Sequence, residues 1–150
     1  MPKLSHMLWF SYQAEEAVNL YTSIFQNSRV LDVIHGPDGA VLTIEFELFG
    51  SKYTALNGGP LYSFNEAFSI VILCDNQLEV DTYWDALIAE GGQPGRCGWL
   101  KDKYGLSWQV VPKQLSECLG NPNPTKAASA LNAMMGMSKL IISELEAAVR

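Results

Sequence analysis

The chain has 150 residues, of which 48% are hydrophobic and 17% are charged, and its formal net charge is −6. This length and composition predict a globular domain with one substantial core and exclude a disordered chain. The negative charge argues against nucleic acid and anionic membranes as partners, and no apolar run reaches the roughly 18 residues of a membrane span.

The first 60 residues contain the pattern of one strand, one helix and three further strands. In the helix, apolar residues recur at spacings of three and four, and Glu15 and Glu16 lie in the first turn, where the helix dipole favours negative charge. The later strands alternate between apolar and polar residues and are separated by turn sequences at 36–39 and at Gly50-Ser51. The predicted elements are strands at 6–12, 29–35, 40–49 and 52–56 and a helix at 13–25.

The next 50 residues repeat this order. A strand at 67–74 precedes a helix at 77–90, which Asp75-Asn76 can cap and Gly91-Gly92 can end. Two short extended pieces fall within 93–100, and a last strand covers 106–111. The repeat rests on the order of the elements and not on residue identity.

The composition changes after Pro112. A rigid break at 121–124 ends in Pro124, which is suited to open a helix, and two helices are predicted at 125–137 and 138–150. We favour a helical hairpin packed on the sheet. The alternative is a contact between subunits through Met134, Met135 and Met137.

The three cysteines, Cys74, Cys97 and Cys118, are odd in number and form no CxxC pair. This pattern favours a reducing compartment, and the first residues do not read as a signal peptide, so we expect a cytoplasmic protein. Cys97 follows Arg96, but neighbouring strand residues point to opposite faces, so a buried structural thiol is expected there.

Several segments resemble PhnB-like proteins, a branch of the glyoxalase/bleomycin resistance protein/dihydroxybiphenyl dioxygenase (vicinal oxygen chelate) superfamily. The resemblance spans nearly the whole chain. The segments are Leu8-Trp9-Phe10 with 13–17 and 21–25, then 55–60, 64–67, 80–87 and 97–100, and finally 104–112.

The resemblance implies an α+β fold of two βαβββ modules that form a curled mixed sheet, followed by C-terminal helices. The modules would cover about 1–60 and 64–113 of a single domain, with the helical segment at about 114–150, and such proteins commonly pair as homodimers. Members of the superfamily can hold a divalent metal through His, Gln or Glu on the first and last strands of each module.

Two residues of this chain match that metal pattern. His6 resembles the first ligand and Gln109 the last, whereas the two middle positions fall near Ala55 and Phe68, which cannot ligate. Two donors do not make a tight site, so we expect no tightly bound metal and no other cofactor, and a divalent metal is the alternative.

Strand alternation predicts which residues line the sheet cavity. If His6 faces inward, so do Leu8 and Phe10, and Met7 and Trp9 then face the helix; Phe68 inward likewise implies Ile70 and Ile72 inward. The predicted lining consists of His6, Leu8, Phe10, Tyr53, Asn57, Phe68, Trp99, Ser107 and Gln109. The alternative is that the aromatic residues simply fill the core.

The leading hypothesis is a protein that binds a small, mostly apolar or aromatic molecule in this cavity without a tight metal. One alternative is a metal-dependent lyase, isomerase or dioxygenase. A second is a methyltransferase, because PhnB-like proteins are often labelled 3-demethylubiquinone-9 3-methyltransferases, although no glycine-rich loop joins a strand to a helix. A third is a structural or interaction module, and the residues leave open whether the protein is an enzyme.

Overall fold

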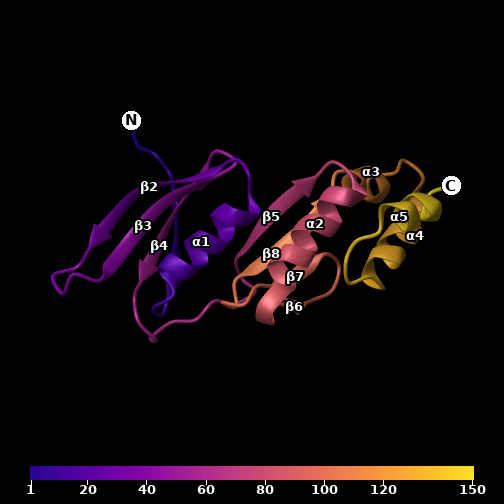
Figure 1. Cartoon of the computed structure of the whole chain (residues 1–150). Helices are drawn as coiled ribbons and strands as arrows, with labels where there is room; N and C mark the ends of the chain where they lie inside the picture. Colours follow the sequence, from indigo (N-terminus) through magenta and orange to yellow (C-terminus); the bar gives the residue numbers. More distant parts are fainter. The chain divides into compact units, whose positions relative to one another are not determined.

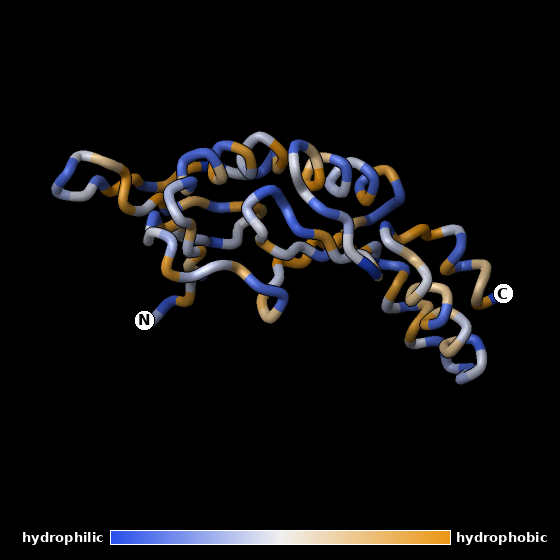
Figure 2. The backbone as a smooth tube through the Cα atoms, turned by 90° about the horizontal axis from the view of Figure 1, so that it is seen from below, coloured by the Kyte–Doolittle hydropathy of each residue, from blue (hydrophilic) through white to orange (hydrophobic).

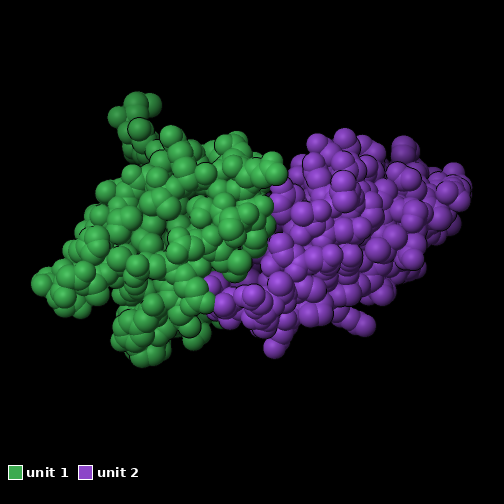
Figure 3. Space-filling model, viewed as in Figure 1, with its two compact units in different colours: residues 1–64 green, residues 65–150 purple.

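The computed structural model describes all 150 residues, which form two compact units, residues 1–64 and residues 65–150 (Figure 3). Each unit contains one four-stranded mixed sheet built in the order strand, helix, three strands, and unit 2 continues with three further helices (Figure 1). The predicted α+β fold with two βαβββ repeats followed by helices is therefore confirmed. No helix is long and apolar enough to cross a membrane.

Unit 1 has the sheet order β1-β4-β3-β2, in which β1 and β4 are parallel and the other pairs are antiparallel. The helix packs against the sheet through Val18 and Tyr21, and the Tyr21 ring stacks on Phe46 with centroids 6.4 Å apart. The elements are β1 (His6–Phe10), α1 (Ala14–Ile24), β2 (Ser28–His35), β3 (Val41–Leu48) and β4 (Ser51–Asn57).

The turn between β3 and β4 differs from the prediction by one residue. Phe49 and Gly50, not Gly50 and Ser51, occupy its two central positions, and both are left-handed, with φ of 47° and 82°. Two consecutive positive φ values match the hairpin turn whose twist fits antiparallel strands. Phe49 is an unusual residue there, and its ring packs edge-on against Phe25 at 5.7 Å.

Unit 2 has the corresponding sheet order β5-β8-β7-β6, with β5 and β8 parallel. The side chain of Asn76 accepts a hydrogen bond from the backbone N–H of Glu79 at 2.9 Å and so caps α2, as predicted. The elements are β5 (Ser69–Cys74), α2 (Gln77–Ile88), a 3-10 turn η1 (Ala89–Gly91), β6 (Gln93–Pro94), β7 (Trp99–Lys101) and β8 (Ser107–Pro112).

The C-terminal segment of unit 2 contains three helices instead of the two predicted, and apolar and polar residues alternate along it (Figure 2). The additional helix is α3 (Gln114–Leu119). It is followed by α4 (Pro124–Met135), which Pro124 opens as predicted and Asn123 caps, and by α5 (Ile142–Ala148). The last helix starts four residues later than predicted, because residues 138–141 form a connection outside any helix, with bends at 138 and 139.

The three C-terminal helices enclose a small core of their own. Met137 is part of this core and is only 8% exposed, whereas Met135 is 56% exposed. The segment is thus a three-helix unit with its own core and not a two-helix hairpin packed on the sheet, and the burial of Met137 argues against a subunit contact made by all three methionines. The buried members are Cys118, Ala130, Met137, Leu140 and Leu145.

Candidate functional site

The sheet of unit 1 has one face covered by α1 and one face turned away from it, which we call the free face. Phe46 faces α1, as its ring contact with Tyr21 shows. Cross-strand partners point to the same face of a sheet, and the register pairs Phe46 with Tyr53 and Ile44 with Ala55 across β4. Tyr53 and Ala55 therefore face α1.

The same register reverses the prediction for β1. His6 lies opposite Tyr53 and Leu8 lies opposite Ala55, so the odd-numbered strand residues, not the even-numbered ones, face away from α1. Leu8 and Phe10 are 1% and 2% exposed and belong to the core. The prediction that they line an open cavity while Met7 and Trp9 face the helix is wrong.

The predicted polar residues of unit 1 mostly bind the backbone. Asn57 accepts a hydrogen bond from the N–H of Ala14, the first residue of α1, at 2.9 Å and donates one to the carbonyl of Val41 at 3.0 Å. The exposed His6 ring lies 5.5 Å from the Tyr53 ring, and its Nδ1 is 3.3 Å from the carbonyl oxygen of Lys52. Burial raises the pKa of Tyr53, so its phenol stays neutral at physiological pH.

In unit 2, the free face is the one turned away from α2. Trp108 and Val110 are almost fully buried on the α2 face, and Ser107 and Gln109 alternate with them on the free face, as predicted. The register places Trp99 opposite Gln109 on the same face. Gln109 donates a hydrogen bond from Nε2 to Ser69 Oγ at 2.9 Å.

The prediction for the start of β5 needs correction. Phe68 lies in a bend before the strand, which begins at Ser69, and it is 44% exposed. Ile72 pairs with Val110 and is 8% exposed, so it packs on the α2 face and not on the free face. Val71 and Leu73 occupy the free face instead.

A pocket of about 420 Å³ lies on the free face of unit 2, beside the β6–β7 hairpin. This volume is within the usual range of about 300–1,000 Å³ for small-molecule sites. Two of the predicted residues, Trp99 and Ser107, line it. The other lining residues are Glu66, Gln93, Pro94, Gly95, Arg96, Leu100 and Lys101.

Ser107 is the distinctive polar group of this pocket. The residue is 1% exposed, and its Oγ has no hydrogen-bond partner. An unsatisfied buried hydroxyl costs roughly 1–3 kcal/mol of stability. A hydroxyl in this position can both donate and accept a hydrogen bond, so a polar atom of a bound molecule would satisfy it.

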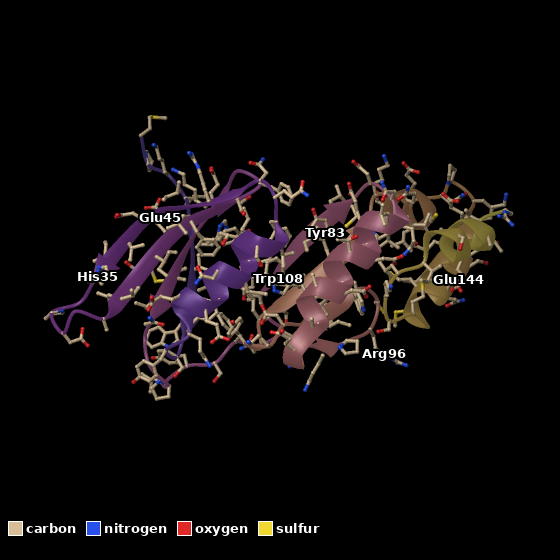
Figure 4. The ribbon with its side chains drawn as sticks, in the orientation of Figure 1. His35, Glu45, Tyr83, Arg96, Trp108 and Glu144 are labelled. Atoms are coloured by element: carbon tan, nitrogen blue, oxygen red, sulfur yellow. The ribbon has the colours of Figure 1, made fainter.

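Only two of the three charged side chains of the pocket pair with each other. Lys101, opposite Ser107 on β7, forms an ion pair with Glu66, and its hydrogen bond lowers the pKa of the Glu66 carboxyl. Arg96 lies on the loop between β6 and β7 (Figure 4) and forms neither an ion pair nor a side-chain hydrogen bond. The pocket therefore carries one uncompensated positive charge, although the chain as a whole is acidic.

The C-terminal segment holds the loop that carries Arg96. The backbone N–H groups of Cys97 and Gly98 donate hydrogen bonds to the carbonyl groups of Met137 and Ser138, at 2.9 and 2.8 Å. The hydroxyl of Ser138 donates a hydrogen bond to the carbonyl of Gly95 at 2.6 Å. Cys97 is half-buried, with Sγ 3.9 Å from Met135 Sδ, and is not the buried thiol that we expected.

The first and last strands of the two repeats present no side chains on their free faces that fit a divalent metal. No group of three His, Cys, Asp or Glu residues is arranged to hold an ion. On the first and last strands of each repeat, the free faces present Met7, Trp9, Lys52, Thr54, Leu56, Ser69, Val71, Leu73, Ser107, Gln109 and Val111. This set contains no imidazole and no carboxylate, the donors that divalent metals prefer in proteins.

Sequence reasoning missed most of the pocket wall. Lys101 was predictable from the sequence, because it alternates with Trp99 along a strand. Arg96 was not, because its position depends on a loop in which Cys97 adopts a left-handed conformation, with φ of 57°.

The comparisons with known proteins agree with this architecture. The family model of the 3-demethylubiquinone-9 3-methyltransferases matches residues 2–111. The PhnB protein from Bacillus cereus is 29% identical, with a TM-score of 0.68, over 74% of this chain and 99% of that chain. No curated protein matches.

More distant structures share the fold. A protein from Pseudomonas aeruginosa has a TM-score of 0.62 at 16% identity, over 75% of this chain and 98% of its own. The fosfomycin resistance protein FosX from Listeria monocytogenes, in its complex with Mn(II) and sulfate ion, has a TM-score of 0.55 at 18% identity, over 73% and 91% of the two chains. The chain belongs to the 3-demethylubiquinone-9 3-methyltransferase family, whose model matches residues 2–111, and it shares the fold of the PhnB protein and of more distant proteins such as FosX.

Proposed function

We propose that the protein binds a small, flat, mostly apolar molecule in the pocket on the free face of unit 2, without a tightly bound metal. The observation that carries the proposal is the buried hydroxyl of Ser107, which lines the pocket and has no partner. Trp99 supplies a half-buried aromatic surface in the same pocket. An apolar pocket with few polar groups that orient the ligand is typical of small-molecule sites.

Two other activities have less support. A metal-dependent reaction would need a group of three His, Cys, Asp or Glu side chains arranged around an ion, which the structure does not contain, and stoichiometric zinc, manganese, nickel or iron in the purified protein would contradict the proposal. A methyltransferase would need a cradle for its nucleotide-like donor. The strand-to-helix loops, 11–13 and 75–76, contain no glycine, so micromolar binding of S-adenosylmethionine would also contradict the proposal.

Calorimetric titration with 2-naphthamide, a flat neutral amide, tests the proposal. We expect saturable binding that Trp99→Ala weakens about tenfold through lost aromatic contact area and Ser107→Ala weakens about fivefold through one lost neutral hydrogen bond. Tyr12→Ala, which removes an exposed aromatic ring from unit 1, is the control and should not change the affinity. Absence of binding, or binding that neither pocket variant weakens, would contradict the proposal.

The stability of the Ser107→Ala variant provides a second, independent test. If the hydroxyl serves a ligand and not the fold, its removal leaves the free energy of unfolding unchanged or raises it by up to about 1 kcal/mol. A variant that binds the probe less well but is at least as stable as the wild type would support a binding role. A loss of stability would show that Ser107 belongs to the structure alone.

We also propose that the protein is a cytoplasmic homodimer. The edge strand β2 exposes Val30, Val33 and Ile34, and exposed apolar edge strands are usually covered in native proteins. Three free cysteines suit a reducing compartment. Sedimentation that shows a monomer at micromolar concentration would contradict the dimer.

A further inference from the structure

The charges of the unit 2 pocket indicate which class of ligand it binds, an inference that rests on the proposed function. Of its three ionic groups, Lys101 and Glu66 pair with each other. Arg96 is the remaining cation, and no acidic side chain of the protein pairs with it. An unpaired guanidinium at a pocket wall offers its N–H donors to a ligand.

An arginine suits one class of ligand group in particular. Its planar guanidinium presents donors in a fork that matches the two oxygens of a carboxylate, and charge-assisted hydrogen bonds of this kind are about twice as strong as neutral ones. A flat molecule with a carboxylate at its edge would use this fork, with Trp99 against its apolar body.

The loop that carries Arg96 is held in place before any ligand arrives. Three hydrogen bonds tie residues 95, 97 and 98 to residues 137 and 138. Gly95 also closes the hairpin, since its N–H donates to the carbonyl of Trp99 at 2.8 Å. Less ordering is then required when the ligand binds.

We infer that the pocket selects aromatic or similarly flat carboxylates, with Arg96 binding the carboxylate and the Ser107 hydroxyl binding a second polar atom of the ligand. Arg96 thereby determines the specificity of the pocket for a charged ligand group.

The test compares 2-naphthoate with 2-naphthamide, which share shape and size and differ in charge, by calorimetric titration at pH 7.5 and low salt. The wild type should bind the carboxylate about tenfold more tightly, as expected for one hydrogen-bonded charge. Arg96→Gln should abolish this preference and leave the affinity for the amide unchanged. The preference should also shrink as salt is added, because Arg96 is exposed.

Two further variants sharpen the comparison. Glu66→Gln frees Lys101 from its ion pair and should increase the preference for the carboxylate. Arg29→Gln makes the same charge change in unit 1, where Arg29 pairs with Glu47, and should leave the preference as it is in the wild type.

The two proposals fail in different ways. If the protein binds neither probe, or binds both regardless of Trp99, the proposed function and this inference fall together. If both probes bind through Trp99 with equal affinity, or if Arg96→Gln keeps the preference, the pocket is a binding site but the inference is overturned.

Discussion

The buried carboxylate of Asp102 accepts a hydrogen bond from the indole N–H of Trp108 at 2.9 Å. Its other oxygen accepts from the backbone N–H groups of Tyr104 and Leu106, at 2.9 and 3.1 Å. One side chain thus fixes both the β7–β8 turn and the largest buried ring of unit 2, which Figure 4 labels. The strands on either side of this turn place Lys101 and Ser107 in the pocket.

Asp102→Asn should therefore destabilise the protein. The new amide NH₂ would face at least one N–H donor in the interior, which predicts a loss of about 2–3 kcal/mol in the free energy of unfolding. Urea denaturation measures this loss. The matched control is Asp32→Asn, on the exposed surface of β2, which should change stability by less than about 0.5 kcal/mol; equal effects of the two substitutions would refute this role for Asp102.

Asn57 is predicted to stabilise the fold and not to bind a ligand. Asn57→Ala removes the acceptor for the N–H of Ala14 and the donor to Val41, so we expect a loss of about 1–2 kcal/mol. Asn57→Asp keeps the acceptor but places a carboxylate oxygen against the Val41 carbonyl, so it should also destabilise the protein. Thermal unfolding measures both variants, and 2-naphthamide affinity should be unchanged in each; a selective loss of affinity without a loss of stability would reverse the assignment.

Substitutions of two glycines in unit 2 distinguish the cost of backbone strain from the cost of steric crowding. Gly98 and Gly105 have the same φ of 85°, but a Cβ at Gly98 would lie 2.9 Å from Leu140 Cδ1 and 3.0 Å from the Val110 carbonyl oxygen, whereas nothing lies within 4 Å at Gly105. Gly105→Ala should cost about 1–2 kcal/mol, the price of the left-handed conformation alone. Gly98→Ala should cost about 1–3 kcal/mol more through overpacking.

The measurement for this pair is the free energy of unfolding in urea. Crowding at Gly98 would also displace the connection at 138–141, which holds the Arg96 loop, so Gly98→Ala should weaken 2-naphthoate binding and Gly105→Ala should not. Equal stability losses would contradict the close approach of Gly98 and Leu140.

The three thiols should differ in reactivity. Burial, with a contribution from the nearby Glu79 carboxylate, raises the pKa of Cys74 to about 12, and burial also raises the pKa of Cys118. A raised thiol pKa leaves almost no thiolate at pH 8, and the thiolate is the reactive form. Native protein should therefore release about one equivalent of thionitrobenzoate quickly, from Cys97.

Two comparisons check this assignment. Cys97→Ser should remove the fast phase, and protein unfolded in guanidinium should react at all three cysteines. Fast reaction of more than one thiol in the native protein would contradict the burial of Cys74 and Cys118. Since raised pKa values delay ionisation, the two slow thiols should begin to react only as the pH rises well above 8.

The order of the elements could be predicted because hydrophobic periodicity and turn residues are local. Alternation on β8 also placed Ser107 and Gln109 on one face correctly. It could not tell which face of β1 the helix covers, because Leu8 and Phe10 are as apolar as Met7 and Trp9. The choice depends on pairing with a strand some 45 residues away.

Other features depend on contacts that a linear pattern does not contain. The helix α3 spans six residues, too few for a reliable period. The pocket wall at 95–98 depends on hydrogen bonds to the chain 40 residues later. The place of Arg96 in the pocket wall therefore could not be predicted from the sequence.

The most direct test of the binding proposal is a crystal structure of the protein grown with 2-naphthamide. We expect the naphthalene ring against Trp99 and a polar atom of the amide within hydrogen-bonding distance of Ser107 Oγ, in the pocket beside the β6–β7 hairpin. A water molecule that satisfies Ser107 in an otherwise empty pocket, or the probe bound only elsewhere, would contradict the proposal.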